Sequence, residues 1–209
     1  MLYADVLLKL NWVDFSNLPG HTAHQRLAPD HRKPAMEYLR ETNDYRTAAV
    51  LALVAPDDEG KACLVLIQRT GGSGVHADQV SFPGGKQEAG EELVDTAIRE
   101  AMEEIGVNPK EIQIFGPLSP LYIPPSKFLV YPFLATVASK QDYLISEQEV
   151  VRVLEIPIAH FLMTDNLKEG VFSSARGYHV HAPYYHWEEL KIWGATAMMI
   201  SEIADLLYD

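Results

Sequence analysis

The sequence has few of the features that mark disulfide-stabilised or polymer-binding proteins. Its 209 residues include one cysteine, so no intrachain disulfide can form. Lysine and arginine number 17 against 29 acidic residues, which gives a formal net charge of −12. Such a surface repels the phosphate backbone of nucleic acids on average, which disfavours a DNA- or RNA-binding protein. A small phosphorylated ligand is not excluded, because a bound metal ion can supply positive charge locally.

Long apolar runs are also missing. The nearest candidate for a membrane span, residues 128–138, is interrupted by Pro132. The N-terminus lacks the basic and apolar regions of a secretory signal, and the C-terminus matches no simple targeting signal. We therefore expect a cytoplasmic protein without a membrane partner. Cys63 lies within the apolar residues 62–67, which predicts a buried, inert thiol.

The composition is that of a globular protein, with 47% hydrophobic and 22% charged residues. Residues 3–13 carry apolar side chains at helical spacing, whereas residues 19–34 are rich in proline, histidine and arginine and predict an ordered loop or arm. We expect an N-terminal helix and arm over residues 1–40 and the main domain over residues 41–209.

The main domain combines strand and helix patterns. A helix is expected over residues 91–105, because it carries an apolar stripe and Gly106 follows it. A second helix is expected over residues 195–208, and a short one over 157–162. Strands are expected over residues 46–54 and 64–68, paired as a hairpin, and over residues 80–82, 112–115 and 128–137. The pattern of residues 147–153 mixes helix and strand features. Two further strands, residues 178–186 and 191–193, are expected to pair with each other. This order predicts an α/β fold in which a mixed β-sheet is sandwiched between helices, α/β/α.

The residues with the clearest chemistry lie on the first of these helices. Glu100, Glu103 and Glu104 are spaced i, i+3 and i+4, so their carboxylates project from one helix face. Crowded carboxylates raise one another's pKa unless a cation neutralises them. Their hard oxygen atoms suit Mg²⁺ or Mn²⁺, which polarise phosphoryl oxygens and lower the pKa of a bound water. The alternative is a solvated acidic helix face.

The whole segment from Gly85 to Val107 resembles the signature of the Nudix hydrolase superfamily, G-x5-E-x7-R-E-U-x-E-E-x-G-U, where U is aliphatic. Every fixed position matches, and the small Ala101 is the one soft departure. The resemblance implies a Nudix fold and a Mg²⁺- or Mn²⁺-dependent hydrolase that cleaves a diphosphate bond in a small nucleotide-like substrate. It implies metal ligands at Glu100, Glu103, Glu104 and the carbonyl of Gly84, with Glu103 or Glu104 orienting or deprotonating water.

The resemblance also implies an ion pair between Glu91 and Arg99 that fixes the preceding loop against the helix. Eight residues separate the two, about two helical turns, so they can meet only if the chain bends where the helix starts. Glycine at position 84 permits the close backbone approach that a carbonyl ligand needs.

A second segment, residues 66–85, resembles the motif of coenzyme A pyrophosphatases within this superfamily, and further likeness extends over residues 45–205. The matching residues are Leu66, Arg69, His76, Phe82, Pro83, Gly84 and Gly85, whereas Ile67, Thr70, Gly74 and Asp78 depart from the motif. The resemblance implies coenzyme A or a derivative as substrate, with phosphopantetheine and adenosine 3′,5′-bisphosphate as products. It implies substrate-binding residues at Arg69, His76, Phe82 and Gly85. Gly74 replaces an expected arginine, and Asp78 adds a negative charge near an anionic substrate.

Several alternatives stay open. Glu149 is a candidate for an extra metal ligand or general base, with Glu147 competing and a surface carboxylate as the simpler interpretation. His179, His181 and His186 suggest either a zinc site or a polar sheet face. Other substrates are ADP-ribose, dinucleotides and nucleoside triphosphates, and another class is a non-catalytic nucleotide-sensing Nudix module. A homodimer is one assembly compatible with the sequence.

Overall fold

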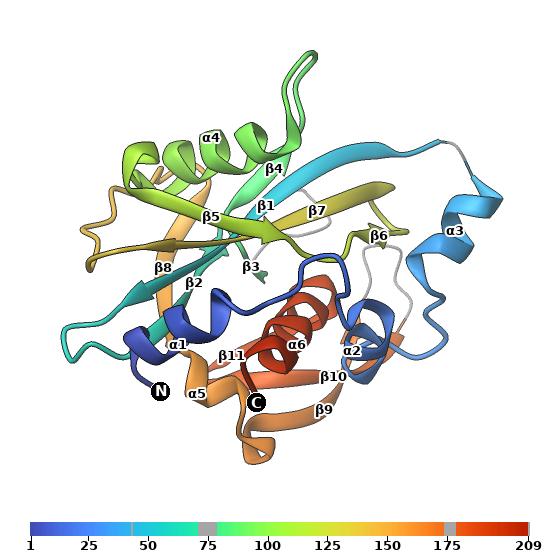
Figure 1. Cartoon of the computed structure of the whole chain (residues 1–209). Coiled ribbons are helices and arrows are strands. Elements are labelled where there is room, and N and C mark those ends of the chain that lie inside the picture. The colour runs from blue at the N-terminus through green and yellow to red at the C-terminus, as the bar shows by residue number, and fades with distance from the viewer. Residues whose placement is uncertain (43, 71–78, 174–178, 209) are drawn as a thin grey trace.

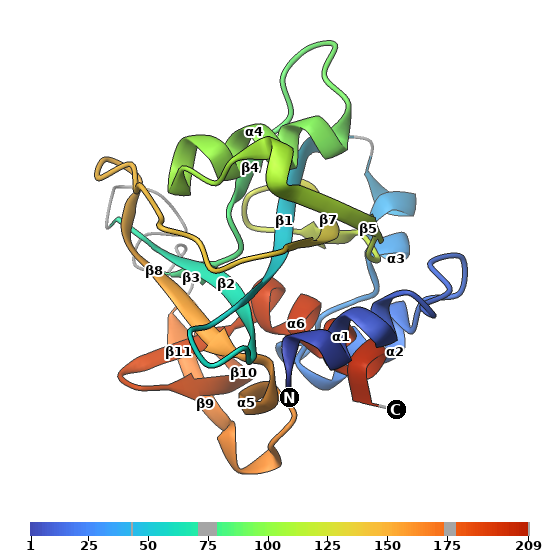
Figure 2. The same ribbon diagram turned by 60° about the vertical axis from the view of Figure 1, so that its left-hand side comes forward.

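The computed structural model describes residues 1–42, 44–70, 79–173 and 179–208. Within these ranges an eight-stranded mixed sheet lies between helices that cover both of its faces (Figure 1, Figure 2). The α/β/α architecture expected from the sequence is therefore confirmed. No helix in the described ranges is long and apolar enough to cross a membrane.

The strand β1 (Arg46–Pro56) lies at the centre of this sheet. It pairs antiparallel with β2 (Ala62–Arg69), which confirms the expected hairpin, and parallel with β7 (Phe128–Val137). The short β4 (Gly84–Lys86) also pairs with β1, beside β2. The remaining strands of the sheet are β3 (Val80–Ser81), β5 (Ile112–Pro117), β6 (Leu121–Ile123) and β8 (Val150–Pro157). A strand covered on both faces is largely apolar, and most of β1 after Thr47 is buried.

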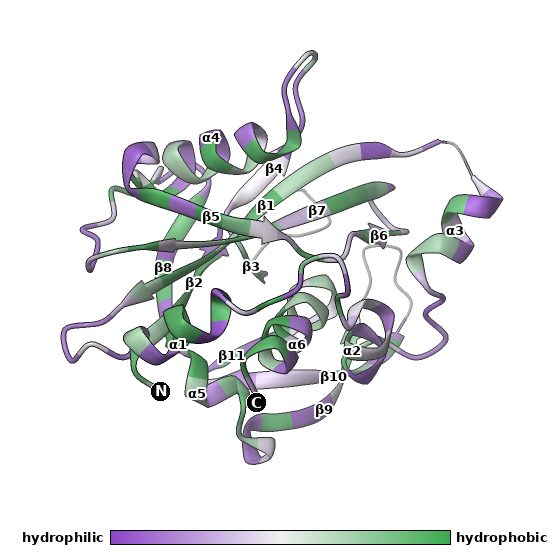
Figure 3. Ribbon diagram, in the orientation of Figure 1, coloured by the Kyte–Doolittle hydropathy of each residue, from purple (hydrophilic) through white to green (hydrophobic). Residues whose placement is uncertain are grey.

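Helix α4 (Leu93–Ile105) covers one face of the sheet, and it begins two residues later than the pattern predicts. Its buried side chains Ala97, Ala101 and Ile105 join the core on this face. Figure 3 shows both hydrophobic and hydrophilic residues along α4, as expected of a helix with one buried side. Gly106 ends the helix with a φ of 71°, in the left-handed region that favours glycine.

Two helices from opposite ends of the chain cover the other face. These are α1 (Tyr3–Leu10) and α6 (Gly194–Tyr208), which share one hydrophobic core. The hydroxyl of Tyr3 donates a hydrogen bond of 2.8 Å to the carbonyl of Val137 in β7. The N-terminal helix is therefore packed into the core of the main sheet.

The expectation of a loop over residues 19–34 was wrong in part. Helix α2 (Gly20–Arg26) lies there and packs on α6, and α3 (Ala35–Glu41) follows it. The buried carboxylate of Glu202 in α6 accepts a hydrogen bond from the backbone N–H of Gly20 and bonds to His24 at 3.0 Å. These contacts come from a distant part of the chain, so the local pattern of α2 gave no sign of them.

A second sheet has three strands within the described residues. Here β10 (His179–Trp187) pairs with β11 (Leu190–Trp193), as expected, and with β9 (Leu167–Ser173), which the sequence pattern did not predict. Most of β9 is exposed, so it lacks the apolar alternation of a half-buried strand. The expected short helix is present as α5 (Ile158–Phe161), and two 3₁₀ turns lie at Pro109–Glu111 and Thr164–Asn166.

Candidate active site

The strand β4 brings two glycines against the acidic side of α4. Gly84 has a φ of 151°, and a Cβ atom there would lie 2.4 Å from the carbonyl oxygen of Ala49 and 2.5 Å from Cα of Val50. At Gly85 a Cβ atom would lie 2.4 Å from the carboxylate carbon of Glu100. Both positions therefore need glycine for the backbone to approach β1 on one side and α4 on the other.

Glu91 and Arg99 form the ion pair that the resemblance implies. Nε of Arg99 donates to one carboxylate oxygen of Glu91 at 2.8 Å, and Nη2 donates to the other at 3.1 Å. The same guanidinium also donates to the carbonyl of Lys86. Because Glu91 precedes the helix and Lys86 ends β4, Arg99 fastens the intervening loop to α4.

Arg99 also holds two of the three glutamates of the helix face. Its Nη1 lies 3.0 Å from Glu100 and 3.1 Å from Glu103. The carboxylate of Glu103 is about half exposed, whereas that of Glu100 is mostly buried against Gly85. This guanidinium therefore sets the positions of both carboxylates.

Glu104 occupies a different environment from the other two. Its side chain is fully buried, and its carboxylate accepts hydrogen bonds from Arg69 Nη1 at 2.5 Å and from the backbone N–H of Gly84 at 2.8 Å. The i, i+3 and i+4 spacing therefore leaves Glu103 facing solvent and directs Glu104 under the β4 strand.

Burial, more than mutual repulsion, changes the acidity of these groups. Burial raises the pKa of Glu100, opposed by Arg99, and repulsion from Glu103 and Glu149 raises it further. Burial likewise raises the pKa of Glu104, opposed by Arg69 and by the Gly84 N–H. We expected repulsion to be the main cause, and it is the smaller one.

Arg69 connects the end of β2 to two of the acidic residues. Besides its bond to Glu104, its Nη2 lies 3.8 Å from the half-exposed carboxylate of Glu149. The backbone N–H of Thr70 donates to the carbonyl of Glu149 at 2.9 Å, which ties this segment to β2. The structure thus brings Glu149 next to the helix glutamates, although it lies 45 residues beyond Glu104 in the chain.

The donor set fits a hard divalent cation in its chemistry and its charge. Five carboxylates, including those of Glu91 and Glu149, share ion pairs with the two guanidinium groups of Arg69 and Arg99. If all five are ionised, three negative charges remain in excess. Among the described residues, no group of three or more Asp, Glu, His or Cys side chains is arranged so that it could hold a metal ion. An ion would therefore share these carboxylates with the arginines.

Other expected site residues do not join this group. Phe82, expected among the substrate-binding residues, is 1% exposed and belongs to the core beneath α6, so its ring cannot line an open site. His76 lies outside the residues that the structure describes. His181 lies 3.6 Å from both Asp30 and Glu169, and no metal-ligand cluster forms around it among the described residues.

One residue of the site carried no signal in the sequence. Thr96, buried under the start of α4, donates its hydroxyl to Glu91 at 2.7 Å. It completes the hydrogen bonding of the carboxylate that Arg99 holds. Threonine is common in helices, so the residue type alone does not indicate a role in the site. Only its position, five residues after Glu91, could have suggested this contact.

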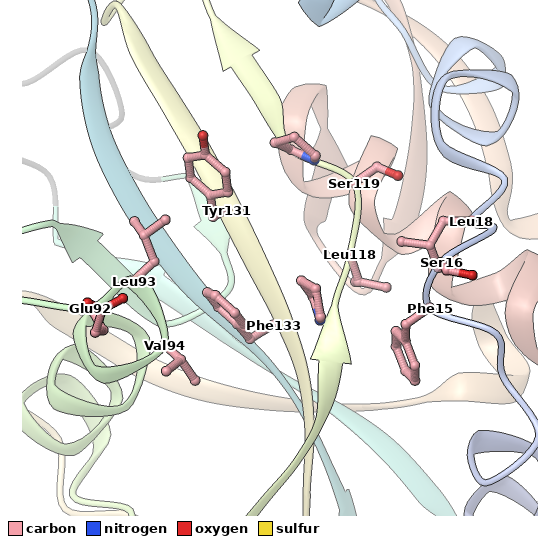
Figure 4. Close-up of a pocket in the computed structure, with 12 residues that line it drawn as sticks. Phe15, Ser16, Leu18, Glu92, Leu93, Val94, Leu118, Ser119, Tyr131 and Phe133 are labelled. Atoms are coloured by element: carbon pink, nitrogen blue, oxygen red, sulfur yellow. The ribbon is translucent and has the colours of Figure 1, made fainter.

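A cavity of about 690 Å³ lies at the N-terminal end of α4, opposite to the end that carries Glu103 and Glu104. Figure 4 shows Tyr131 and Phe133 of β7, with Leu93 of α4, on one side of it. Phe15 and Leu118 lie on the other side. Its lining is largely apolar, unlike the acidic site.

Comparisons with known proteins agree with this architecture. A family model of the NUDIX domain matches residues 45–174. The uncharacterized Nudix hydrolase NudL of Pectobacterium atrosepticum is 30% identical over 168 residues, covering 79% of this chain and 85% of that protein. The mitochondrial coenzyme A diphosphatase NUDT8 of Homo sapiens is 34% identical over 166 residues, covering 77% of this chain and 69% of that protein.

A solved structure shows the same fold. A MutT/nudix family protein from Enterococcus faecalis superposes with a TM-score of 0.53 at 15% identity, covering 86% of this chain and 72% of that chain. A mixed sheet between helices, with a glycine loop leading into an acidic helix, defines the class of Nudix-fold proteins. The chain belongs to the Nudix hydrolase family, whose members generally use divalent metal ions.

Proposed function

We propose that this enzyme hydrolyses a diphosphate bond in a nucleotide-like substrate with Mg²⁺ or Mn²⁺ held by Glu100, Glu103, Glu104 and the carbonyl of Gly84. The observation that carries the proposal is the approach of Glu100 and Glu104 to the Gly84–Gly85 backbone. It places carboxylate oxygens and a backbone turn side by side in a region with excess negative charge. Oxygen donors of this kind are those that Mg²⁺ and Mn²⁺ prefer.

A bound divalent ion would supply Lewis-acid polarisation of the phosphoryl oxygens and a more acidic water. The chain's own residues have separate tasks. Arg99 keeps Glu100 and Glu103 in place, and Glu91 keeps Arg99 in place. Glu103 or Glu104 orients or deprotonates the attacking water, with Glu149 as an additional base or ligand.

Arg69 has two tasks in this proposal. In the structure it neutralises Glu104, which lowers the cost of burying that carboxylate. A guanidinium has five N–H donors, so the groups that Arg69 does not use on Glu104 can donate to a substrate phosphate. Its side chain is partly exposed, as this contact requires.

The proposed substrate is coenzyme A or a derivative, cleaved to phosphopantetheine and adenosine 3′,5′-bisphosphate. The matching residues of the 66–85 motif support it, as does the 34% identity to the human coenzyme A diphosphatase. The departures at Gly74 and Asp78 favour a second candidate, a Nudix hydrolase for ADP-ribose, dinucleotides or nucleoside triphosphates.

The test is a substrate panel assayed with Mg²⁺ and with Mn²⁺. We expect turnover of coenzyme A, and we expect Glu104→Gln to lower kcat at least about a hundredfold because it removes an anionic ligand. Asp95→Asn is the matched control, because Asp95 is an exposed carboxylate on the same helix.

Circular dichroism should show that both variants keep the fold. Near-normal turnover by the Glu104→Gln variant would overturn the assignment of the site. Binding of panel members without turnover under either metal would instead indicate a nucleotide-sensing module.

A further inference from the structure

The hydroxyl oxygen of Ser81 in β3 is buried and forms no hydrogen bond with any of the described residues. Buried polar atoms in folded proteins nearly always have a partner, because an unpaired donor or acceptor costs free energy. Within the described ranges, Ser126 in the turn between β6 and β7 has the other hydroxyl of this kind. The two hydroxyl groups differ in their surroundings, since only that of Ser81 lies beside the acidic site.

The alternation of side chains along β3 directs the Ser81 hydroxyl towards α4. Its neighbours Val80 and Phe82 belong to the core that α1 and α6 share. Ser81 itself pairs with Ile67 of β2, which belongs to the core beneath α4. Paired residues of a sheet point to the same face, whereas successive residues of a strand point to opposite faces. The hydroxyl therefore lies on the face of the main sheet that α4 covers.

Ser81 lies between the two groups that hold Glu104. Arg69 follows Ile67 by two residues, so it is a diagonal neighbour of Ser81 across the strand pair, at roughly 7–8 Å. Arg69 donates to Oε1 of Glu104. Gly84 follows Ser81 by three residues, and its backbone N–H donates to Oε2 at 2.8 Å. The Ser81 hydroxyl and the Glu104 carboxylate therefore share the space between β2, β4 and α4.

A divalent ion at Glu104 changes which donors this carboxylate can keep. The ion and the guanidinium of Arg69 compete for the same lone pairs, and their positive charges repel each other at such short range. A carboxylate that binds the ion therefore loses pairing with Arg69. A hydroxyl can take the place of the guanidinium as hydrogen-bond donor, because it is neutral and does not repel the ion.

We propose that Ser81 is a positioning residue for Glu104, whose carboxylate accepts a hydrogen bond from the Ser81 hydroxyl once a divalent ion displaces Arg69. The proposal rests on the proposed function, in which Glu104 holds Mg²⁺ or Mn²⁺. Ser81 acts through Glu104 and not on the substrate. The displaced guanidinium of Arg69 is then free to donate to a substrate phosphate.

This role predicts that one substitution has different effects on stability and on metal affinity. Ser81→Ala removes a buried hydroxyl that has no partner in the metal-free fold, so the metal-free protein should be at least as stable as wild type. The same change deprives the metal-bound carboxylate of a donor. The affinity for Mn²⁺ should therefore fall about tenfold, because a hydrogen bond to a charged group is lost.

Ser126→Ala is the matched control, because it makes the same change at the other buried, unpaired hydroxyl. The strands β1 and β7 separate β6 from β2, so Ser126 lies away from the acidic site. We expect this variant to be at least as stable as wild type without metal and to bind Mn²⁺ within about twofold of wild type.

The experiment uses the full chain after removal of metal with a chelator. Calorimetric titration with Mn²⁺ alone measures the affinity, and urea unfolding without metal measures the stability. Ser81→Cys is a further variant, since a thiol has a similar shape but is a weak donor. Its affinity for Mn²⁺ should lie between those of wild type and Ser81→Ala.

An unchanged affinity in Ser81→Ala, a wild-type affinity in Ser81→Cys, or an equal loss of affinity in Ser126→Ala would each overturn the role of Ser81. Clear destabilisation or misfolding of metal-free Ser81→Ala would do the same, because the hydroxyl would then have a partner without metal. In all of these cases the wild type still binds Mn²⁺, so the proposed function stands. A wild type that binds no Mn²⁺ instead overturns the metal site itself.

Discussion

At the scale of single residues, Arg99 has the largest structural role in the site. It contacts the loop through Lys86 and Glu91 and the helix face through Glu100 and Glu103. Hydrogen bonds from Arg99, followed by that from the Thr96 hydroxyl, lower the pKa of Glu91 to about 2. The loop and the helix are therefore joined by a carboxylate that stays ionised at any physiological pH.

This depressed pKa predicts how the pair contributes to stability as pH changes. The folded value of about 2 lies below the ordinary value of 4.5, so the ion pair stabilises the fold fully above about pH 4.5 and loses its contribution as pH falls towards 2. We expect Glu91→Gln to unfold at lower denaturant concentration than wild type at pH 6, and the difference to shrink between pH 4.5 and 2. Urea unfolding of the metal-free protein measures this, with Glu88→Gln as the control; a difference that is constant over this range contradicts the prediction.

At the scale of elements, α4 follows local rules that a sequence displays directly. Its apolar stripe has the helical period, and Gly106 provides the left-handed residue that ends it. The strand β9 and the helix α2 show the opposite case, because their positions depend on partners far along the chain. Local pattern therefore predicted the acidic helix α4 better than the elements at the periphery.

The end of α4 gives a prediction about glycine. Gly106→Ala should lower the free energy of unfolding by about 1–2 kcal/mol from the left-handed backbone alone. It should lose more because the new Cβ would lie 2.8 Å from Cβ of Leu144. Gly90→Ala is the control, with a φ of 82° and nothing within 4 Å of the added atom. Equilibrium unfolding in urea compares the two, and equal losses would show that the contact with Leu144 has no energetic effect.

At the scale of the whole molecule, the first helix is part of the domain core. Val6 and Leu10 are 0% and 1% exposed, in the same cluster as α6 and the strands of the main sheet. Packing therefore joins the N-terminal helix to the residues beyond the boundary that we expected near residue 40.

This packing predicts unequal effects along α1. Leu10→Ala should destabilise the protein by about 2–5 kcal/mol, because it leaves a cavity in the core. Leu8→Ala, on the same helix but 65% exposed, should change stability by less than about 0.5 kcal/mol. Chemical denaturation measures both, and a small effect at Leu10 would show that α1 contributes little to the core.

The sequence by itself determined the family, the α/β/α fold and the position of the acidic helix. These depend on short-range spacing, which fixes the helix face of Glu100, Glu103 and Glu104 and the turn at Gly106. The tertiary structure decided which side chains share an environment. It buried Glu104 under β4 beside Arg69, placed Phe82 in the core and brought Glu149 to the site. Burial and long-range contacts arise only when strands pair and helices pack, so no local pattern contains them.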